Sequence, residues 1–144
     1  MQLALNLAKQ AACEGEVPVG AIVVVQGQMM GWACNDRQQS KDVLGHAELI
    51  ALRMACKTLN SWRLPPRSTL YVTLEPCCMC AGALTQARLS RLVFGCRDTK
   101  AGGVRSLFAL ADDPRLTHRI QVEEGLLAQD CQTILQQFFT NLRE

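Results

Sequence analysis

The first stretch of the chain has apolar residues at helical spacing. Leu3, Leu7 and Ala11 recur every four residues, and Gly15 and Pro18 follow them. Apolar residues at this spacing form one face of a helix, and glycine and proline commonly end one. We therefore expect a first helix over residues 1 to about 14, lying on a sheet.

The pattern then changes to one typical of strands. Val19–Val25 is a β-branched apolar run, Met29–Ala33 is a second short run, and Gln26-Gly27-Gln28 separates them. Two such runs joined by a short glycine-containing turn predict a β-hairpin. The polar residues 35–45 are expected to form a loop after it.

Helical and strand patterns alternate through the rest of the sequence. In chain order we expect a helix of about 14 residues from His46, a strand over Leu70–Leu74, a helix over Cys77–Ala87, a strand over Arg91–Gly95, a short helix over Ser106–Ala111, a short strand over Ile120–Val122 and a C-terminal helix. The apolar face of that last helix comprises Leu127, Cys131, Ile134, Leu135, Phe138 and Leu142. Strands alternating with helices predict an α/β layered domain with a central sheet.

Composition is consistent with a folded domain of ordinary size. The chain has 144 residues, of which 49% are hydrophobic and 19% charged, so we expect one globular domain over 1–144. The sequence has no run of about 18 apolar residues and no basic segment ahead of an apolar core near Met1, so we expect a cytoplasmic protein with no membrane partner. Eight cysteines in such a chain favour metal binding over a disulfide framework.

Charge alone does not identify a partner. The net charge is +2 and the pI about 8.2, which is below the strongly basic range of dedicated nucleic-acid-binding domains. Basic residues do outnumber acidic ones between 88 and 119, where they are Arg88, Arg91, Arg97, Lys100, Arg105, Arg115 and Arg119. This stretch is either a solvated surface or a patch that contacts phosphates.

Two short motifs supply the residues of a hydrolytic zinc site. His46, Cys77 and Cys80 give three ligands, which leaves the fourth tetrahedral position of a zinc ion open, whereas a structural zinc is usually closed by four. Pro76 marks Cys77 as the first ligand of the pair, and Cys78 is expected to lie beside the site. A helix N-terminus at this pair favours the thiolate form of both ligands.

Glu48 is the spare carboxylate of this group. It follows His46 by two residues, where it can reach a water molecule at the metal without ligating the ion. A carboxylate there can take a proton from water and pass protons to a ring nitrogen and to departing ammonia. The chemistry expected from these residues is hydrolytic deamination.

Each feature also has a simpler explanation. Cys-x-x-Cys alone is more often a structural zinc or redox pair, and His-x-Glu alone carries no meaning. We expect the remaining cysteines to be small buried hydrophobic residues, and His118 to be a surface or loop residue; these cysteines are Cys13, Cys34, Cys56, Cys96 and Cys131.

Taken together, the residues resemble the cytidine-deaminase-like superfamily, which has a His-x-Glu and Pro-Cys-x-x-Cys signature. The resemblance is closest to its bacterial tRNA-specific adenosine deaminases and runs through most of the chain. It includes Glu16–Ala21, His46-Ala47-Glu48, Ala51-Leu52-Arg53, Leu70–Cys77, Met79–Ala83, Val93-Phe94-Gly95, Arg97-Asp98 and Lys100.

The resemblance implies a three-layer α/β/α fold with a five-stranded mixed central sheet. It implies a homodimer with one zinc ion per subunit, acting on the wobble adenosine of an arginine tRNA anticodon to form inosine. By position, His46, Cys77 and Cys80 match the zinc ligands and Glu48 the proton shuttle. Asn35 matches a residue that hydrogen-bonds the target base and Ala47 one whose backbone lines the base pocket, while Asp98 and Lys100 match contacts to anticodon nucleotides.

Structural roles remain open for two of these residues: Asn35 can cap a turn, and Asp98 can pair with Arg97. Val43-Leu44-Gly45 departs from the Pro-Thr-Ala usual in relatives, so the pocket wall is expected to differ. The sequence also ends at Glu144 without the basic tail of many relatives, from which we expect weaker binding to phosphates.

Two rival functions remain. One is a deaminase of a free base or nucleoside, such as guanine or cytidine, built on the same zinc centre. The other is a structural zinc module that binds RNA or a protein partner without catalysis. Turnover in Glu48→Gln separates the enzyme from the binding module. We expect an RNA partner and no DNA partner, because loop bases of RNA are already splayed and need no extraction from a duplex.

Overall fold

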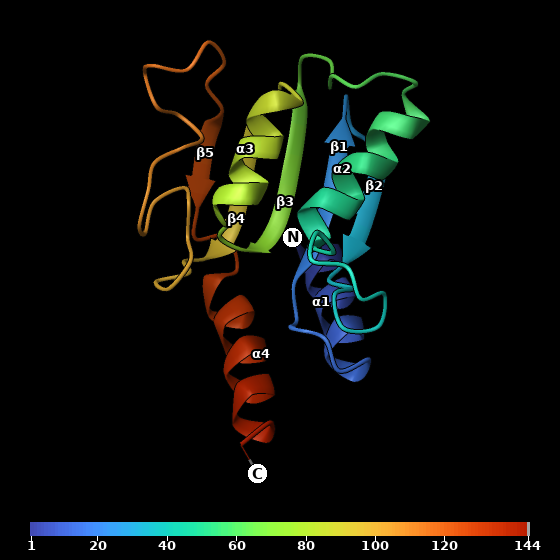
Figure 1. Cartoon of the computed structure of the whole chain (residues 1–144), viewed down its shortest axis with the longest axis vertical. Helices are drawn as coiled ribbons and strands as arrows, with labels where there is room; N and C mark the ends of the chain where they lie inside the picture. Colours follow the sequence, from blue (N-terminus) through green and yellow to red (C-terminus); the bar gives the residue numbers. More distant parts are fainter. Residues whose placement is uncertain (144) are drawn as a thin grey trace.

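A five-stranded mixed sheet forms the centre of the molecule in the computed structural model, which describes residues 1–143 (Figure 1). The strand order is β2 (Gln28–Cys34), β1 (Gly20–Val25), β3 (Ser68–Leu74), β4 (Arg91–Cys96) and β5 (Gln121–Glu124). β1 is antiparallel to both of its neighbours, whereas β3, β4 and β5 are mutually parallel. The mixed sheet implied by the resemblance is therefore confirmed.

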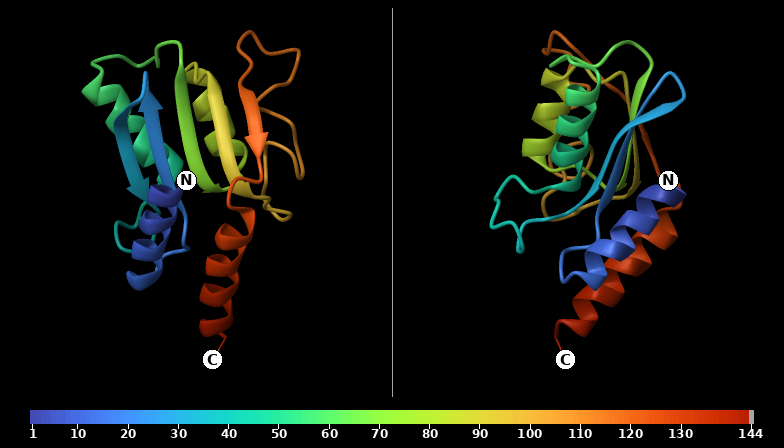
Figure 2. Two further views of the ribbon diagram at one scale, coloured as in Figure 1. Left: turned by 180° about the vertical axis from the view of Figure 1, so that it is seen from behind. Right: turned by 90° about the vertical axis from the view of Figure 1, so that its right-hand side faces the viewer.

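Helices cover both faces of this sheet. α2 (Ala47–Thr58) and α3 (Cys78–Gln86) lie side by side on one face, and α1 (Gln2–Cys13) and α4 (Ala128–Asn141) lie on the other (Figure 2). The right-hand view of Figure 2 shows the sheet between the two pairs. The three-layer α/β/α fold is confirmed as well.

The main hydrophobic core lies between the sheet and the α2–α3 pair. Its buried members come from the strands and from both helices. They include Leu70, Val72 and Phe94 of the sheet, Ala51 of α2 and Leu84 of α3. Each fully buried side chain of this kind contributes about 1.5–3 kcal/mol relative to an exposed one. This packing fixes where α2 and α3 begin, and so where the motif residues lie.

The hairpin and most element boundaries agree with the sequence-based expectations. Gln26 and Gly27 both have positive φ, 50° and 81°, between the paired residues Val25 and Gln28. Two consecutive residues with left-handed backbone conformation form a tight two-residue turn whose twist matches that of the flanking strands. His46 is the residue before the first turn of α2, not a member of it, and β5 starts one residue later than expected.

The short helix expected over Ser106–Ala111 is wrong. These residues form turns and irregular structure. The physical reason is that the backbone N–H groups of Val104, Arg105 and Ser106 all donate to one carboxylate, that of Glu75. A helix-like sequence pattern does not reveal this tertiary acceptor.

Of the helices in residues 1–143, none combines the length and apolar character that crossing a membrane requires.

Candidate active site

Three loops meet at one edge of the sheet. β2, β3 and β4 run in the same direction, because β1 is antiparallel to both β2 and β3 and because β3 is parallel to β4. Their carboxyl ends therefore share an edge. The loop 35–46 follows β2, residues 75–77 follow β3 and the loop 97–106 follows β4. Binding sites of open α/β sheets commonly lie outside such carboxyl ends.

His46, Cys77 and Cys80 converge at this edge. Nδ1 of His46 lies 3.4 Å from Sγ of Cys80 and 3.7 Å from Sγ of Cys77. All three ligand atoms lie within 4.8 Å of one another. His46 and Cys77 immediately precede α2 and α3, so the positive ends of two helix dipoles point at the group. These three residues can hold a metal ion.

The pKa shifts of His46, Cys77 and Cys80 also indicate a cation site. The pKa of Cys77 falls to about 4, chiefly because Cys80 hydrogen-bonds to it, and the pKa of Cys80 is raised for the same reason. The pKa of His46 is raised by its hydrogen bond to Cys77. A bound cation would favour the thiolate form of both cysteines, because a coordinating thiol is deprotonated.

Glu48 lies beside this group with one oxygen unpartnered. Its side chain is 4% exposed, and among residues 1–143 its Oε2 is the buried side-chain polar atom without a hydrogen-bond partner. Burial raises the pKa of Glu48 to about 7. A buried carboxylate oxygen costs free energy unless something pairs with it. The orphaned oxygen therefore points to a ligand or substrate group that completes the site.

Asn35 connects the first loop to α2. Its Oδ1 accepts a hydrogen bond from the N–H of Ala47 at 2.9 Å, and both residues are buried. The side chain thus has the capping role left open by the sequence, although it caps α2 rather than a turn. Its amide nitrogen donates to no described protein atom, so it remains a donor for a substrate.

The third loop, which carries Asp98 and Lys100, pairs with Cys77 through Gly102. Oδ1 of Asp98 accepts the N–H groups of Lys100 at 3.0 Å and Ala101 at 3.1 Å. Arg97 pairs with Glu124, and its two guanidinium bonds are both 2.8 Å long. The Asp98–Arg97 pair considered from sequence is therefore not formed. Lys100 is exposed, which suits contact with an anionic ligand.

Glu75 joins this third loop to the residues that precede α3. Its carboxylate is 2% exposed and accepts the N–H of Arg105 at 2.6 Å, Ser106 at 2.8 Å and Asp98 at 3.0 Å, together with the Ser106 hydroxyl. Burial alone would raise the pKa of Glu75, but these hydrogen bonds outweigh it and the pKa is lowered. A Cβ on Gly102 would strike the same carboxylate.

The whole chain matches a known family. The model of the MafB19-like deaminases matches residues 1–143. The tRNA-specific adenosine deaminase of Streptococcus pyogenes serotype M1 is 43% identical over 144 residues, which cover 100% of this chain and 84% of the relative. The chain belongs to the tRNA-specific adenosine deaminases. It is therefore a deaminase.

Solved structures agree with this membership. A tRNA:A34 deaminase, studied for A-to-I editing at the wobble position of transfer RNA, superposes with a TM-score of 0.89 at 41% identity, covering 94% of this chain and 97% of that one. Guanine deaminase from Nitrosomonas europaea superposes with a TM-score of 0.79 at 22% identity, covering 96% of this chain and 82% of that one. The second likeness shows the shared fold alone.

The three residues just before His46 form an apolar end of the first loop. Val43 is 71% exposed and Leu44 43% exposed, so both present apolar side chains to solvent. Gly45 packs against the backbone of Asp36 so closely that a Cβ would collide with the Asp36 carbonyl. A residue with a Cβ at position 45 would therefore force this loop to shift.

Most cysteines other than Cys77 and Cys80 are less buried than expected. Cys131 is fully buried, whereas Cys34, Cys56 and Cys96 are half-buried and Cys13 is exposed. The expectation of burial is thus wrong for Cys13. Cys78 is exposed on the first turn of α3 and is not part of the ligand group. His118 lies in a loop, as expected, with Nε2 2.6 Å from the carbonyl oxygen of Leu89.

Sequence reasoning assigned no role to Glu75. The available signal was a carboxylate placed between an apolar strand and Pro76, where a buried residue is expected. A buried charge there needs several donors, and these come from a loop more than 20 residues away in the chain. Only the folded structure identifies those donors.

We expect Glu75→Gln to lower the free energy of unfolding by about 1–3 kcal/mol, because a glutamine has one acceptor oxygen and leaves at least one of the loop N–H groups unsatisfied. Thermal denaturation of the metal-loaded protein measures this. Glu123→Gln is the matched control, because it makes the same chemical change in an exposed pair with Arg91, where the expected loss is about 0–1 kcal/mol. Equal losses in the two variants would show that Glu75 does not hold the loop.

Proposed function

We propose that the chain is a single zinc-dependent deaminase domain that converts adenosine to inosine at the wobble position of a tRNA anticodon, with an arginine tRNA as substrate. The observation that carries this proposal is the unpartnered Oε2 of Glu48 beside His46, Cys77 and Cys80. It occurs in a chain 43% identical to a tRNA-specific adenosine deaminase.

The three ligand residues fit zinc in particular. Zinc bonds to sulfur at about 2.3 Å and to imidazole nitrogen at about 2.0–2.1 Å with tetrahedral angles, so the N···S separation around it is about 3.6 Å. The observed separations of 3.4 and 3.7 Å lie on either side of this value. One imidazole and two thiolates, with a fourth position left open, are also a ligand set typical of catalytic zinc. When bound, zinc supplies a Lewis acid that makes an attacking water more acidic.

Glu48 performs the proton transfers in this proposal. Its Oε2 accepts a proton from the attacking water as the water oxygen bonds to C6 of the adenine ring. Glu48 then delivers that proton to the ring nitrogen N1. It next carries the proton of the new C6 hydroxyl to the exocyclic amine, which leaves as ammonia as the C6–N bond breaks and the C6 carbonyl forms. Adenosine and water thereby give inosine and ammonia. Burial of Glu48 at 4% exposure keeps bulk water from competing for the proton.

The remaining residues of this edge bind the RNA. We assign the free amide group of Asn35 to a hydrogen bond with the target base, and the backbone at Ala47 to the wall of the base pocket. Asp98 and Lys100 are assigned to the neighbouring anticodon nucleotides. The exposed ammonium group of Lys100 suits a phosphate, and the loop that carries both residues is held by Glu75.

A homodimer in the cytoplasm completes the proposal. Large apolar side chains are exposed on this chain, among them Phe108 at 55% and Leu107 at 52%, and a second copy would remove such surface from water. Light scattering should then give twice the 15.9 kDa of one chain. A monomeric variant with full activity on tRNA would contradict a shared RNA surface.

The zinc-loaded protein should form inosine at the wobble position of an arginine tRNA anticodon stem-loop and at no other adenosine. Digestion of the RNA to nucleosides and mass spectrometry quantify the inosine, and sequencing locates it. A stem-loop with guanosine at the wobble position is the control. No inosine from folded, zinc-bound protein would contradict the proposal and favour a deaminase of free guanine or cytidine.

A further inference from the structure

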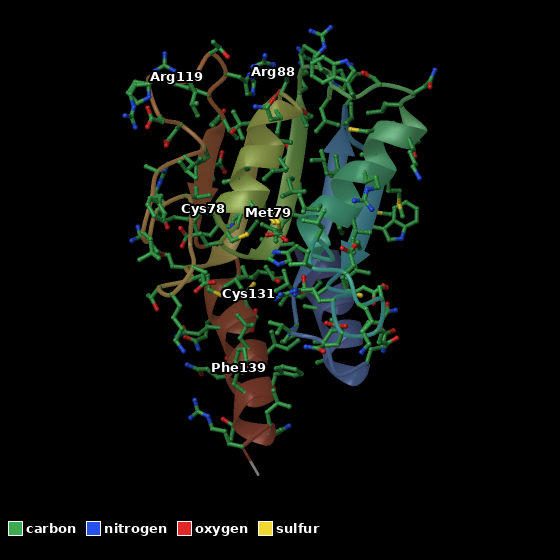
Figure 3. All side chains as sticks on the ribbon, in the orientation of Figure 1. Cys78, Met79, Arg88, Arg119, Cys131 and Phe139 are labelled. Atoms are coloured by element: carbon green, nitrogen blue, oxygen red, sulfur yellow. The ribbon has the colours of Figure 1, made fainter. Side chains whose placement is uncertain are left out.

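Arginines gather at the end of the molecule opposite the candidate active site. β3, β4 and β5 begin there, and the segments 59–67, 85–91 and 115–121 lead into or lie beside these strands. Figure 3 shows Arg88 and Arg119 at this end, far from Phe139 on α4. The three segments contain no aspartate or glutamate, and their arginines are Arg63, Arg67, Arg88, Arg91, Arg115 and Arg119.

Two of these arginines are neutralised by neighbouring carboxylates. Arg91 pairs with Glu123 and Arg115 with Asp113, each at 2.6 Å. The ion pairs of residues 1–143 include none of the other arginines at this end, which are Arg63, Arg67, Arg88 and Arg119. Four positive charges therefore remain uncompensated on a chain whose net charge is only +2.

A groove lies at this end, and two of the uncompensated arginines, Arg63 and Arg88, line it. Its volume is about 610 Å³, and the rest of its lining comprises Ser61, Ser90, His118 and the apolar residues Leu59, Leu64, Pro65 and Pro66. Guanidinium groups are donors that proteins use to bind phosphate oxygens. The Ser61 hydroxyl and Nε2 of His118 already bond the carbonyl oxygens of Arg63 and Leu89, so the two guanidinium groups are the donors that suit an anion here.

The backbone at two of these arginines gives an independent argument. Arg67 and Arg88 have φ values of +64° and +62°, in the left-handed region that favours glycine or asparagine. Arg88 directly follows the C-cap of α3, the position where helices most often carry glycine. Arginine stands at both positions despite a backbone cost, and such strained positions often carry a function of the side chain.

We propose that this groove, together with Arg67, which follows the groove-lining Pro66, binds phosphate groups of the RNA backbone as a second contact surface separate from the anticodon pocket. This inference rests on the proposed function, because the RNA is the substrate named there. α3 has 9 residues, so the groove lies about 14 Å along its axis from Cys77. An RNA held at the pocket can extend over that length.

Features of the groove favour RNA over an acidic protein. Guanidinium groups bind phosphates with two parallel hydrogen bonds. The Arg63 guanidinium lies 5.0 Å from the ring centroid of Trp62, which is itself 68% exposed. An exposed aromatic ring next to arginines offers a stacking surface for an unpaired base.

The double variant Arg67→Gly/Arg88→Gly tests the groove without unfolding the protein, because glycine adopts both backbone conformations more readily than arginine. Binding of a fluorescently labelled full-length tRNA transcript with a wobble adenosine is measured by anisotropy over a range of KCl concentrations. We expect the Kd at low salt to rise roughly ten-fold and the slope of log K against log[KCl] to fall by about 0.7–0.9 for each lost phosphate contact. The thermal midpoint should stay the same or rise.

Lys9→Gln is the matched control, since it removes an exposed cation from α1 and should leave the Kd and the salt slope unchanged. An unchanged Kd and slope in the double variant would overturn the proposal and leave the groove for an acidic protein partner. The inosine assay on the wild-type protein is read separately. Weaker, less salt-dependent binding by the double variant would support the groove even if the wild type formed no inosine, which would contradict only the proposed function.

Discussion

In Glu48→Gln, the rate of adenosine deamination is expected to fall about 10²- to 10⁴-fold while the metal content stays that of the wild type. Glutamine has the size of glutamate but cannot accept a proton from water at Oε2. That oxygen is buried and has no partner among residues 1–143, so no neighbouring group of the described chain replaces it. The loss should therefore fall on the chemical step.

Stability should change little in this variant, or increase. A buried carboxylate with an unpartnered oxygen costs more free energy than a buried neutral amide. Active sites commonly lower the stability of the folded protein, and replacing a catalytic charged residue by a neutral one then often raises it. Thermal denaturation of the two proteins, both loaded with metal, gives the comparison.

Single-turnover inosine formation and metal analysis by mass spectrometry give the two main readouts for Glu48→Gln. Glu123→Gln is the control, because its carboxylate pairs with Arg91 on the exposed part of the sheet. Inosine formation at the wild-type rate by metal-loaded Glu48→Gln would remove Glu48 from the chemistry. It would favour a structural metal in a binding module.

Sequence patterns located the ligand group because its residues lie next to element boundaries. His46 precedes α2 and Cys77 precedes α3, and both boundaries are marked in the sequence, by the start of an apolar stripe and by Pro76. The predicted strand Leu70–Leu74 ends three residues before Cys77, which places Cys77 at the carboxyl end of that strand. Short-range patterns were enough for this part of the site.

Long-range hydrogen bonds could not be predicted in the same way. The Ser106–Ala111 helix was expected from local apolar spacing, whereas the chain there follows the carboxylate of Glu75. Likewise, the left-handed backbone at Arg67 and Arg88 has no local marker, because neither position carries glycine or asparagine. The interaction that decides the Ser106–Ala111 segment joins residues far apart in the chain, whereas Arg88 lies in a local helix end where the Leu89 N–H donates to the Leu84 carbonyl.

The sequence did not decide whether the basic stretch between 88 and 119 is a solvated surface or a patch that contacts phosphates. The structure separates its arginines into paired and unpaired ones. Arg91, Arg97, Arg105 and Arg115 are all paired with carboxylates, so that much of the stretch is a solvated surface. Arg88 and Arg119 instead lie at the end of the sheet with Arg63 and Arg67. Counting charges along a sequence cannot show this separation, because Glu123 and Glu124, the partners of Arg91 and Arg97, come from a distant segment.

Removal of the metal is the second large change that we expect. Chelation should abolish deamination and lower the free energy of unfolding by about 4 kcal/mol relative to protein held at 1,000 times the Kd of the ion, because an ion that binds only the folded state stabilises it in proportion to RT ln(1 + [L]/Kd). Cys77→Ser and Cys80→Ser should lose the metal and the same stability. Metal analysis and thermal denaturation at fixed zinc concentration measure both effects.

Cys78→Ser is the control for these two variants. It tests whether any cysteine substitution at the start of α3 lowers metal content and stability. Cys78 is adjacent to Cys77 in sequence but exposed, and it lies outside the ligand group, so its variant should keep both metal and thermal midpoint. Loss of metal from Cys78→Ser, with retention by Cys77→Ser, would show that the ligand pair is misassigned. The variants of Cys77 and Cys80 should lose more than that of Cys78 because the ligand atoms of Cys77 and Cys80 lie within 4.8 Å of that of His46, and a bound cation would compensate the charge of both thiolates.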